Sequence, residues 1–391
     1  MNKKMTVLFL IDGLGLGGAE TSITEITSRF SKVKPVIIHL HDIIDHKPYL
    51  VQNGIQVYSL NIRDKKDIKG TLDKIRPIVV EVQPSIIHST LHWSDHLARL
   101  LKKEFNNIKL INSFVSNTYG KDRYRRMSFL RRLKLKWVEL KDKNSAPIVD
   151  LFISNSKSIK KDNIKALGIP EEKVVVIPRG RNTVLYDIPE KESEDFKREM
   201  GVQGKDIILN VGRLIKTKAQ LDLIRGFSKV APQYPDTVLW LVGEGDCQEL
   251  LEEEIKNLKI TDRVLLLGQR TDIPLLLSVA KIFVFPSHLE GMPGALIEAM
   301  MAGKLIISSD IPENRECLPS DCGLFYKTGN TGGLANQMVS ALDNFERLQD
   351  KAERARDFAT QNYDLSKISS LHESVYFDLI KDNNSIIKEL I

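Results

Sequence analysis

The chain has 391 residues, which is too long for one typical hydrophobic core and suits two domains of roughly 200 residues or fewer. Hydrophobic residues make up 42% and charged residues 28%, and this balance excludes a disordered chain. The net charge of +6 is a modest excess. Three cysteines with no CxxC pair exclude a disulfide framework, disfavour zinc and fit a reducing compartment.

The first apolar run, Met5 to Ile11, stops at Asp12 and has no small-residue cleavage site directly after it. It is therefore interpreted as a first buried strand and not as a signal peptide. No apolar run approaches the ~18 residues that a membrane span needs. We expect a cytoplasmic protein, with peripheral contact to the inner face of the cell membrane left open.

Short apolar runs alternate with amphipathic stretches along the first half. The predicted strands there are Thr6–Ile11, Val36–Leu40, Ile55–Ser59, Ser85–His88, Lys109–Asn112, Leu151–Ser154 and Val174–Ile177. Amphipathic helices are predicted between several of them, such as Glu20–Arg29 and Ser94–Glu104. This alternation predicts a parallel sheet with helices on both faces.

A polar segment, Arg181 to Glu199, separates this half from a second alternating series. Its predicted strands are Ile207–Val211, Val238–Val242, Val264–Leu267, Ile282–Phe285 and Leu305–Ser308, with helices at Gln220–Val230, Gln248–Leu258 and Pro293–Ala302. The fold class predicted is α/β, with two doubly wound, Rossmann-like domains facing each other across a cleft. We place the domains at residues 1–184, joined by a C-terminal helix over 371–391, and at residues 185–370.

A glycine-rich loop, DGLGLGGAE, follows the first strand and opens a helix. Gly13, Gly15 and Gly18 satisfy GxGxxG, and Asp42 stands about where a dinucleotide fold has its ribose-binding acid. Three interpretations compete: nicotinamide binding, a turn needed only for close packing, and approach of the backbone to a phosphate at the helix start. We favour the approach of the backbone to a phosphate. Nicotinamide binding is disfavoured because the motifs of the second half of the chain point to a function other than that of a dehydrogenase.

The strongest pattern is FPSHLEGMPGALIEAM, which begins at Phe285. Glu290 lies in the loop after a strand, Pro293 suits a first helical turn, and Glu298 lies inside the helix. Such an element can hold a sugar on Glu290, a diphosphate at the helix start and a ribose on Glu298. The alternative is that Glu290 caps the helix and Glu298 is an exposed helix residue.

Basic residues follow another strand end, in NVGRLIKTK. Arg213 and Lys218 lie in a loop at the carboxyl end of a strand, a position suited to cations that bind phosphate. A solvated basic loop would show the same sequence pattern. The turn at Gly243 and Glu244, after the next strand, either closes the nucleotide pocket or is only a turn.

These segments together resemble the GT-B glycosyltransferases of family 4, which are retaining enzymes that use nucleotide sugars. The matching stretches are GGAE at 17–20, VGRL and its lysine at 211–218, LVGEGD at 241–246, and 286–316 with its E-x7-E pattern. The resemblance covers the second half and more faintly the first.

The resemblance implies a donor site in the second domain and acceptor binding in the first. Arg213 and Lys218 would neutralise the leaving diphosphate, and Glu290 would hold the donor sugar; these three are the catalytic candidates. The donor-binding candidates are Gly17, Gly18, Gly243, Glu244, Gly291, Met292, Pro293 and Glu298. No metal and no cofactor are expected. The family's histidine near residues 110–113 is absent, Arg179 replaces its usual asparagine and Ala219 a usual glycine.

A basic segment over 121–140, KDRYRRMSFLRRLKLKWVEL, carries apolar residues at helical spacing. Two interpretations remain open: a helix that docks on an anionic membrane, and a helix that packs its apolar stripe on the domain. Nucleic acid is not an expected partner. We expect transfer from a nucleotide sugar, with UDP favoured, to a lipid-linked or other saccharide acceptor in cell-surface polysaccharide synthesis. The alternatives are a non-catalytic nucleotide-sugar-binding protein and a sugar-nucleotide epimerase on the same fold.

Overall fold

The computed structural model describes residues 4–125, 127–382 and 385–391, with only the backbone for Lys121 and Asp122. The chain folds into two compact units. The first unit contains Met1–Gly180 and Leu365–Ile391, and the second contains Arg181–Asp364.

The first unit is built on a parallel sheet of seven strands in the order β3-β2-β1-β4-β5-β6-β7. The strands are β1 (Met5–Ile11), β2 (Val33–His39), β3 (Gln56–Ser59), β4 (Ile86–Thr90), β5 (Lys109–Phe114), β6 (Leu151–Ser154) and β7 (Val174–Val176). Most are rich in Val, Ile and Leu, as expected where both faces of a parallel sheet are covered, and the edge strand β3 (QVYS) is the least buried. The order reverses between β1 and β4, which is the point where such sheets bind ligands.

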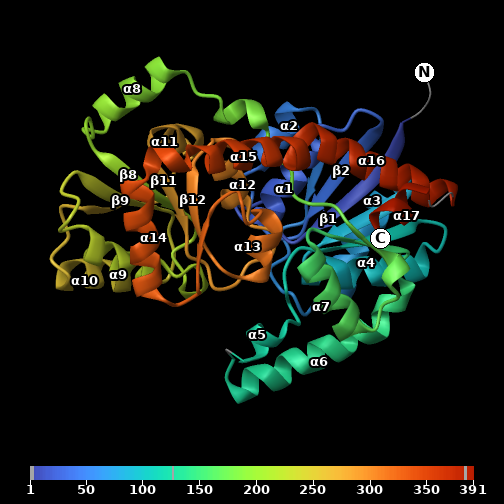
Figure 1. The fold of residues 1–391 in the computed structure, drawn as a ribbon. Coiled ribbons are helices and arrows are strands. Elements are labelled where there is room, and N and C mark those ends of the chain that lie inside the picture. The colour runs from blue at the N-terminus through green and yellow to red at the C-terminus, as the bar shows by residue number, and fades with distance from the viewer. Residues whose placement is uncertain (1–3, 126, 383–384) are drawn as a thin grey trace. The chain divides into compact units, whose positions relative to one another are not determined.

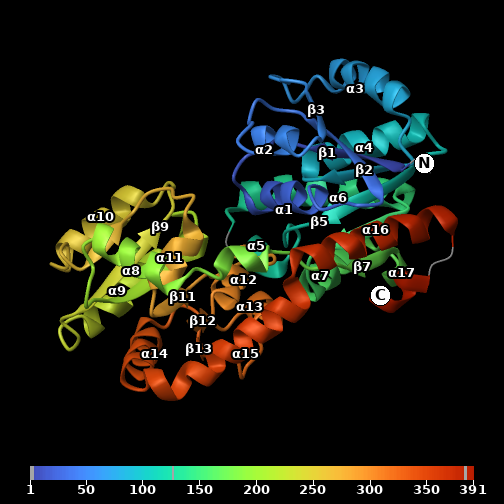
Figure 2. The same cartoon turned by 90° about the horizontal axis from the view of Figure 1, so that it is seen from above.

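Alternate residues of β1 show how the two faces are filled. Leu8 and Leu10 pack with α3 (Ile68–Val82) and α4 (His92–Glu104), whereas Val7 and Phe9 pack with α1 (Gly18–Thr27) and α16 (Leu365–Lys381). Figure 2 shows these helix pairs on opposite faces of the sheet. The remaining helices of this unit are α2 (Lys47–Gln52), α5 (Lys121–Arg125), α6 (Phe129–Ser145), α7 (Lys157–Leu167) and α17 (Ser385–Leu390).

The late helix α16 is an integral part of the first unit, where it lies along α1 (Figure 1). Its Tyr376 and Val375 are buried among residues of β1 and α1. The carboxylate of Glu373, also buried, accepts hydrogen bonds from the backbone N–H groups of Ser31, Lys32 and Val33 at 2.6–2.8 Å. Apolar packing and a buried carboxylate therefore both fix α16 to the start of β2.

The second unit has a parallel sheet of six strands in the order β10-β9-β8-β11-β12-β13. The strands are β8 (Asp206–Val211), β9 (Thr237–Val242), β10 (Val264–Leu266), β11 (Ile282–Phe285), β12 (Leu305–Ser309) and β13 (Leu324–Tyr326). The helices are α8 (Glu190–Glu199), α9 (Gln220–Val230), α10 (Gln248–Asn257), α11 (Ile273–Val279), α12 (Gly294–Met301), α13 (Pro312–Cys317), α14 (Thr331–Asp343) and α15 (Phe345–Tyr363). Two parallel sheets with helices on both faces confirm the predicted α/β class.

Besides shifted ends of elements, two features differ from the sequence prediction. The three-residue strand β13 was not predicted, because LFY is too short to show a period. The basic segment is not one helix: α5 ends at Arg125 and α6 begins after Ser128, whose extended backbone (ψ 158°) interrupts the helical path. Arg126 lies outside the described residues. Across the described part of the chain, we find no helix long and apolar enough to cross a membrane.

Candidate functional site

In the second unit the strand order reverses between β8 and β11, and the two loops that follow these strands carry the predicted cations and carboxylate. Lys218 ends the loop after β8, Glu290 lies in the loop after β11, and their side chains form an ion pair with Nζ and Oε1 2.6 Å apart. The Glu290 side chain is 8% exposed. The fold thus brings together two groups that are 72 residues apart in the sequence.

The two loops are also joined by His288, which the sequence analysis did not single out. Its backbone N–H donates to the carbonyl of Thr217 at 2.8 Å, and its Nε2 lies 2.8 Å from the carboxylate of Asp222 at the start of α9. These contacts fix the relative position of Lys218 and Glu290 without any ligand.

The turn at Gly243 and Glu244 supports the loop that carries Arg213. A Cβ on Gly243, whose φ is +131°, would stand 2.2 Å from the carbonyl oxygen of Gly212, so only glycine fits. The carbonyl of Glu244 accepts from the N–H of Leu214 at 2.9 Å. Backbone contacts on both sides of Arg213 thus hold this loop, while the Arg213 side chain is exposed.

Glu298 lies on α12 and is mostly buried. Its Oε1 accepts from Nε of Arg181 at 2.7 Å, and the two side chains are 17% and 5% exposed. Glu290 does not cap this helix, since Pro293 is the N-cap and no side chain caps it. The alternative in which Glu290 caps the helix and Glu298 is an exposed helix residue is therefore wrong.

The remaining donor-binding candidates around α12 can contribute mainly through their backbone. The Met292 side chain is buried in the core of the second unit, and Pro293 has no N–H to donate. Gly294 begins the helix, and a Cβ there would stand 2.2 Å from a terminal nitrogen of Arg181. A side chain at Gly294 would therefore have to displace the guanidinium of Arg181.

Gly17 and Gly18 lie in the first unit, at the start of α1. Gly17 is the N-cap and no side chain caps the helix. A Cβ on Gly18 would stand 2.3 Å from Nη1 of Arg179, the residue that replaces the family's asparagine. The glycine therefore gives room to a cation at the positive end of a helix, a place suited to an anion.

Two histidines lie in and directly after β4, and the one inside the strand, His88, is structural. It is buried, its ring nitrogens lie 2.8 Å from the hydroxyls of Tyr376 and Ser113, and burial holds its pKa well below the usual range. His92, at the start of α4, is different: its Nδ1 lies 3.5 Å from Oδ2 of Asp142, and this contact raises its pKa.

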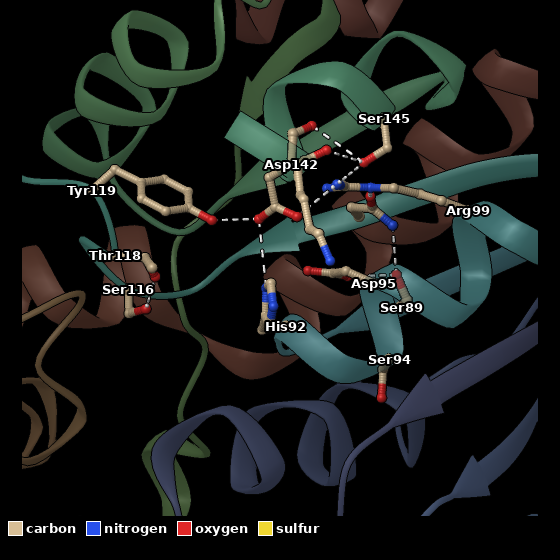
Figure 3. A network of polar contacts seen from close by, with 12 residues as sticks. Ser89, His92, Ser94, Asp95, Arg99, Ser116, Thr118, Tyr119, Asp142 and Ser145 are labelled. Carbon is tan, nitrogen blue, oxygen red and sulfur yellow. Dashed lines mark hydrogen bonds and ion pairs between the residues drawn. The ribbon is translucent and has the colours of Figure 1, made fainter. Parts of the chain in front are cut away.

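His92 belongs to a polar network that sequence reasoning missed. Tyr119 and Arg99 also reach Asp142, and the three side chains converge on its carboxylate from three directions (Figure 3). The network lines a cavity of about 450 Å³ in the first unit. No local motif could have revealed it, because Arg99 and Asp142 are 43 residues apart and meet only in the folded sheet.

The apolar stripe of the basic segment is not packed on the first unit. Leu130, Leu133, Trp137 and Leu140 are 77%, 54%, 59% and 51% exposed. The hypothesis that α6 buries this stripe against its own domain is therefore wrong. The helix instead presents apolar and basic side chains on one accessible surface, and Nζ of Lys141 lies 3.4 Å from the ring centre of Trp137.

Two family models match almost adjoining parts of the chain. The model described as Glycosyltransferase Family 4 matches residues 16–185, and the model described as Glycosyl transferases group 1 matches residues 192–358. Among curated relatives, N-acetyl-alpha-D-glucosaminyl L-malate synthase of Bacillus anthracis is 28% identical over 197 residues, 50% of this chain and 51% of the relative.

A second relative, UDP-Gal:alpha-D-GlcNAc-diphosphoundecaprenol alpha-1,3-galactosyltransferase of Escherichia coli, is 26% identical over 255 residues, which are 64% of this chain and 65% of the relative. The chain thus spans about half to two thirds of the length of these relatives. Among solved structures, Anabaena HepE in complex with UDP and glucose superimposes with a TM-score of 0.85 at 20% identity, covering 96% of this chain and all of HepE. This similarity establishes a shared GT-B fold.

Proposed function

Because the chain belongs to the group 1 glycosyltransferases, we propose that it transfers a sugar from a nucleotide-diphosphate sugar to an acceptor hydroxyl, with retention at the anomeric carbon and without a bound metal ion. The second unit would bind the donor, and UDP is the favoured nucleotide. The observation that carries the proposal is the ion pair of Lys218 with Glu290 at the strand-order reversal of the second sheet.

The pair combines the two chemistries that a sugar donor needs side by side. As the bond between the anomeric carbon and the diphosphate breaks, negative charge grows on the β-phosphate. The ammonium of Lys218 and the guanidinium of Arg213 would stabilise that charge, as prearranged cations do. The carboxylate of Glu290, within 2.6 Å of Lys218, would accept hydrogen bonds from hydroxyls of the sugar being transferred.

Glu298 would bind the ribose of the donor. Arg181 occupies one of its oxygens and holds the carboxylate in place, so a ribose hydroxyl would donate to the other oxygen or displace the guanidinium. Gly294 and Ala295, the first residues of α12, lie between the two glutamates in sequence, and their backbone N–H groups would face the diphosphate.

A thermal-shift titration tests the donor assignment. UDP, GDP and NAD are each added to the full chain, with and without EDTA. A ligand that binds only the folded state stabilises it by about 2.7 kcal/mol at 100 times its Kd. We expect UDP to raise Tm and NAD to have no effect, with the UDP shift unchanged by EDTA. A shift by NAD alone, or a UDP shift lost on chelation, would contradict the proposal.

Turnover separates the enzyme from a binding protein or an epimerase. UDP release from a UDP-sugar in the presence of acceptor supports transfer. Binding of the donor without release would indicate a non-catalytic protein. Conversion of the donor to its epimer would indicate a sugar-nucleotide epimerase.

For the acceptor we propose a lipid-linked saccharide at the cytoplasmic face of the cell membrane, in the synthesis of a cell-surface polysaccharide. Support comes from α6, whose exposed apolar stripe is interleaved with basic residues. Residues 121–136 contain eight Lys and Arg against one Asp, which matches an anionic bilayer in charge. Relatives from E. coli and Campylobacter jejuni are named as transferases that act on sugars linked to diphospho-undecaprenol.

Vesicle sedimentation tests the membrane contact. We expect the protein to sediment with vesicles containing phosphatidylglycerol at low salt and to be released near 1 M salt, where the Debye length is about 3 Å. Leu133→Ser with Trp137→Ser should abolish sedimentation, and Arg131→Gln with Lys134→Gln should weaken it. The control variant Lys191→Gln with Glu192→Gln, at two exposed residues of α8, should sediment as wild type does. Sedimentation that persists in the Leu133 and Trp137 variant would show that α6 does not bind the bilayer.

A further inference from the structure

The turn that carries Lys218 is held in a conformation that its own sequence disfavours. Lys216–Lys218 form a single 3₁₀ turn after β8, and Ala219, which follows, has a φ of +57°. This left-handed conformation is unfavourable for a residue with a side chain. Ile215 and Lys216 also line a cavity of about 200 Å³, so a packed core does not fix this side of the turn. The position of the Lys218 side chain therefore depends on contacts that come from outside the turn.

His288 supplies two such contacts, one on each side of Lys218. Its backbone N–H donates to the carbonyl of Thr217 at 2.8 Å, and its Nε2 lies 2.8 Å from Oδ2 of Asp222, in the first turn of α9. A carboxylate only accepts, so Nε2 carries the hydrogen and donates it to Asp222. The N–H of Asp222 in turn donates to the carbonyl of Ala219 at 3.0 Å. His288 thus holds the chain at Thr217 and Asp222, which bracket both the cation and the left-handed residue.

The loop that carries His288 is itself fixed to the sheet. It follows β11, the strand that pairs with both β8 and β12. The carbonyl of Ser287 accepts from the hydroxyl of Ser309, at the end of β12, at 2.5 Å, and both serines are buried. Glu290, two residues beyond His288, has a side chain that is only 8% exposed. The side chain of His288 therefore links the turn that carries Lys218 to a loop whose own position is set by the sheet.

We propose that His288 is a positioning residue for the diphosphate of the donor: through its side-chain hydrogen bond to Asp222 it sets the position of the ammonium of Lys218. The proposal rests on the proposed transferase function, in which Lys218 stabilises charge on the β-phosphate, and adds a residue that acts on the phosphate only through Lys218. The backbone bond to Thr217 is present whatever the side chain at position 288, so substitution tests the bond to Asp222. A ligand without a β-phosphate gains nothing from this positioning.

Affinities for UDP and UMP, measured by isothermal titration calorimetry on the full chain, test the proposal without an acceptor. GDP and GMP replace them if GDP alone raises Tm. Since UMP lacks the β-phosphate, the ratio of the two dissociation constants isolates the groups that bind this phosphate. We expect His288→Ala to weaken UDP binding about five- to ten-fold, the scale of a charged hydrogen bond that is partly lost, and to leave UMP binding unchanged. A variant that only loosens the fold would weaken both ligands equally, so equal losses, or no loss, would overturn the proposal.

Two further substitutions at the same position test whether the hydrogen bond is responsible. His288→Gln keeps an N–H that can reach Asp222 and should restore most of the UDP affinity. His288→Asn is one carbon shorter and should bind UDP as weakly as His288→Ala does. UDP binding by His288→Gln that is no tighter than that of His288→Asn would overturn the role of the hydrogen bond.

The matched control removes an ion pair that joins the same two strands at their other ends. Nζ of Lys281, directly before β11, lies 2.8 Å from Oδ2 of Asp206, the first residue of β8. Lys281→Gln should leave both affinities unchanged, because the amino ends of parallel strands lie at the sheet edge opposite the two loops. A loss of UDP affinity in Lys281→Gln as large as in His288→Ala would show that any weakening of the contact between β8 and β11 has this effect.

A double variant tests whether His288 acts through Lys218. In the Lys218→Ala background, His288→Ala should cause no further loss of UDP affinity, because the cation that it positions is absent. A further loss as large as in the wild-type background would overturn the proposal. The same measurements separate the two proposals. Wild-type UDP affinity in Lys218→Ala refutes the donor assignment, whereas a loss in Lys218→Ala with none in His288→Ala leaves that assignment standing and refutes the role of His288.

Discussion

Asp95 provides a direct test of the electrostatics in the first unit. Its carboxyl accepts from the hydroxyl of Ser89 at 2.5 Å, and burial raises its pKa from 3.8 to about 7, against the opposing charge of Arg99. Because the folded-state pKa lies above the unfolded one, the folded protein binds a proton more readily between about pH 4 and 7. Stability therefore falls as the pH rises through this window, and the full penalty applies above about pH 7.

Asp95→Asn removes the titrating group and keeps an oxygen that can accept from Ser89. A difference of about three pH units corresponds to roughly 4 kcal/mol as an upper limit. Because Asp95 keeps some solvent access, we expect about half of this, ~2 kcal/mol, as a gain in stability near pH 8. Near pH 4.5 the gain should largely vanish, since wild-type Asp95 is then protonated.

Differential scanning calorimetry at the two pH values measures the effect. A gain of ~2 kcal/mol corresponds to a rise in Tm of about 4–8 °C for a unit of this size. Asp42→Asn, at an exposed aspartate of the same unit, is the matched control and should shift Tm little at either pH. A loss of stability at both pH values would show that Asp95 is ionised and serves as an ion partner of Arg99, and the reasoning would be wrong.

Three further predictions concern the second unit. Lys218→Ala and Arg213→Ala should each lower kcat about 100-fold, the scale of a lost charge stabiliser, and unchanged steady-state kinetics would refute the donor site. Arg181→Met should lower the free energy of unfolding in urea by about 3 kcal/mol, because it leaves the carboxylate of Glu298 unpaired at 17% exposure. The double variant Arg181→Met with Glu298→Met should recover most of that loss, and equal destabilisation in both variants would contradict the prediction. Ala219, at φ +57°, takes a left-handed conformation that costs a non-glycine residue about 1–2 kcal/mol. Ala219→Gly should therefore stabilise the unit by roughly 0.5–1 kcal/mol, once the greater backbone entropy that glycine loses on folding is subtracted. A drop in the urea midpoint of this variant would refute the prediction.

The strands could be predicted from the sequence because each is a short Val, Ile and Leu run bounded by charges or turn residues. Leu151–Ser154 and Ile282–Phe285 have the predicted bounds, and most other strands differ by one to three residues at an end. The break in the basic segment was missed because the apolar spacing continues through it. Only the backbone at Ser128, with no helix-breaking residue beside it, shows that α6 begins there.

The candidate site was predictable in part and for a physical reason. Motifs at strand ends are local, so the loops carrying Lys218 and Glu290 could be found without the fold. The ion pair between them depends on β8 lying beside β11, which strand order alone decides. The partner of Glu298 and the network around Asp142 depend on contacts between residues far apart in sequence, and no local pattern indicates them.

The position of α16 has a consequence for biosynthesis. Residues 1–180 leave the ribosome first, but their sheet lacks Tyr376, Val375 and the carboxylate of Glu373 until the second unit has been made. The second unit is continuous in sequence and can complete its core earlier. During synthesis the apolar face of β1 and α1 therefore stays uncovered until α16, which follows the whole second unit, has been made.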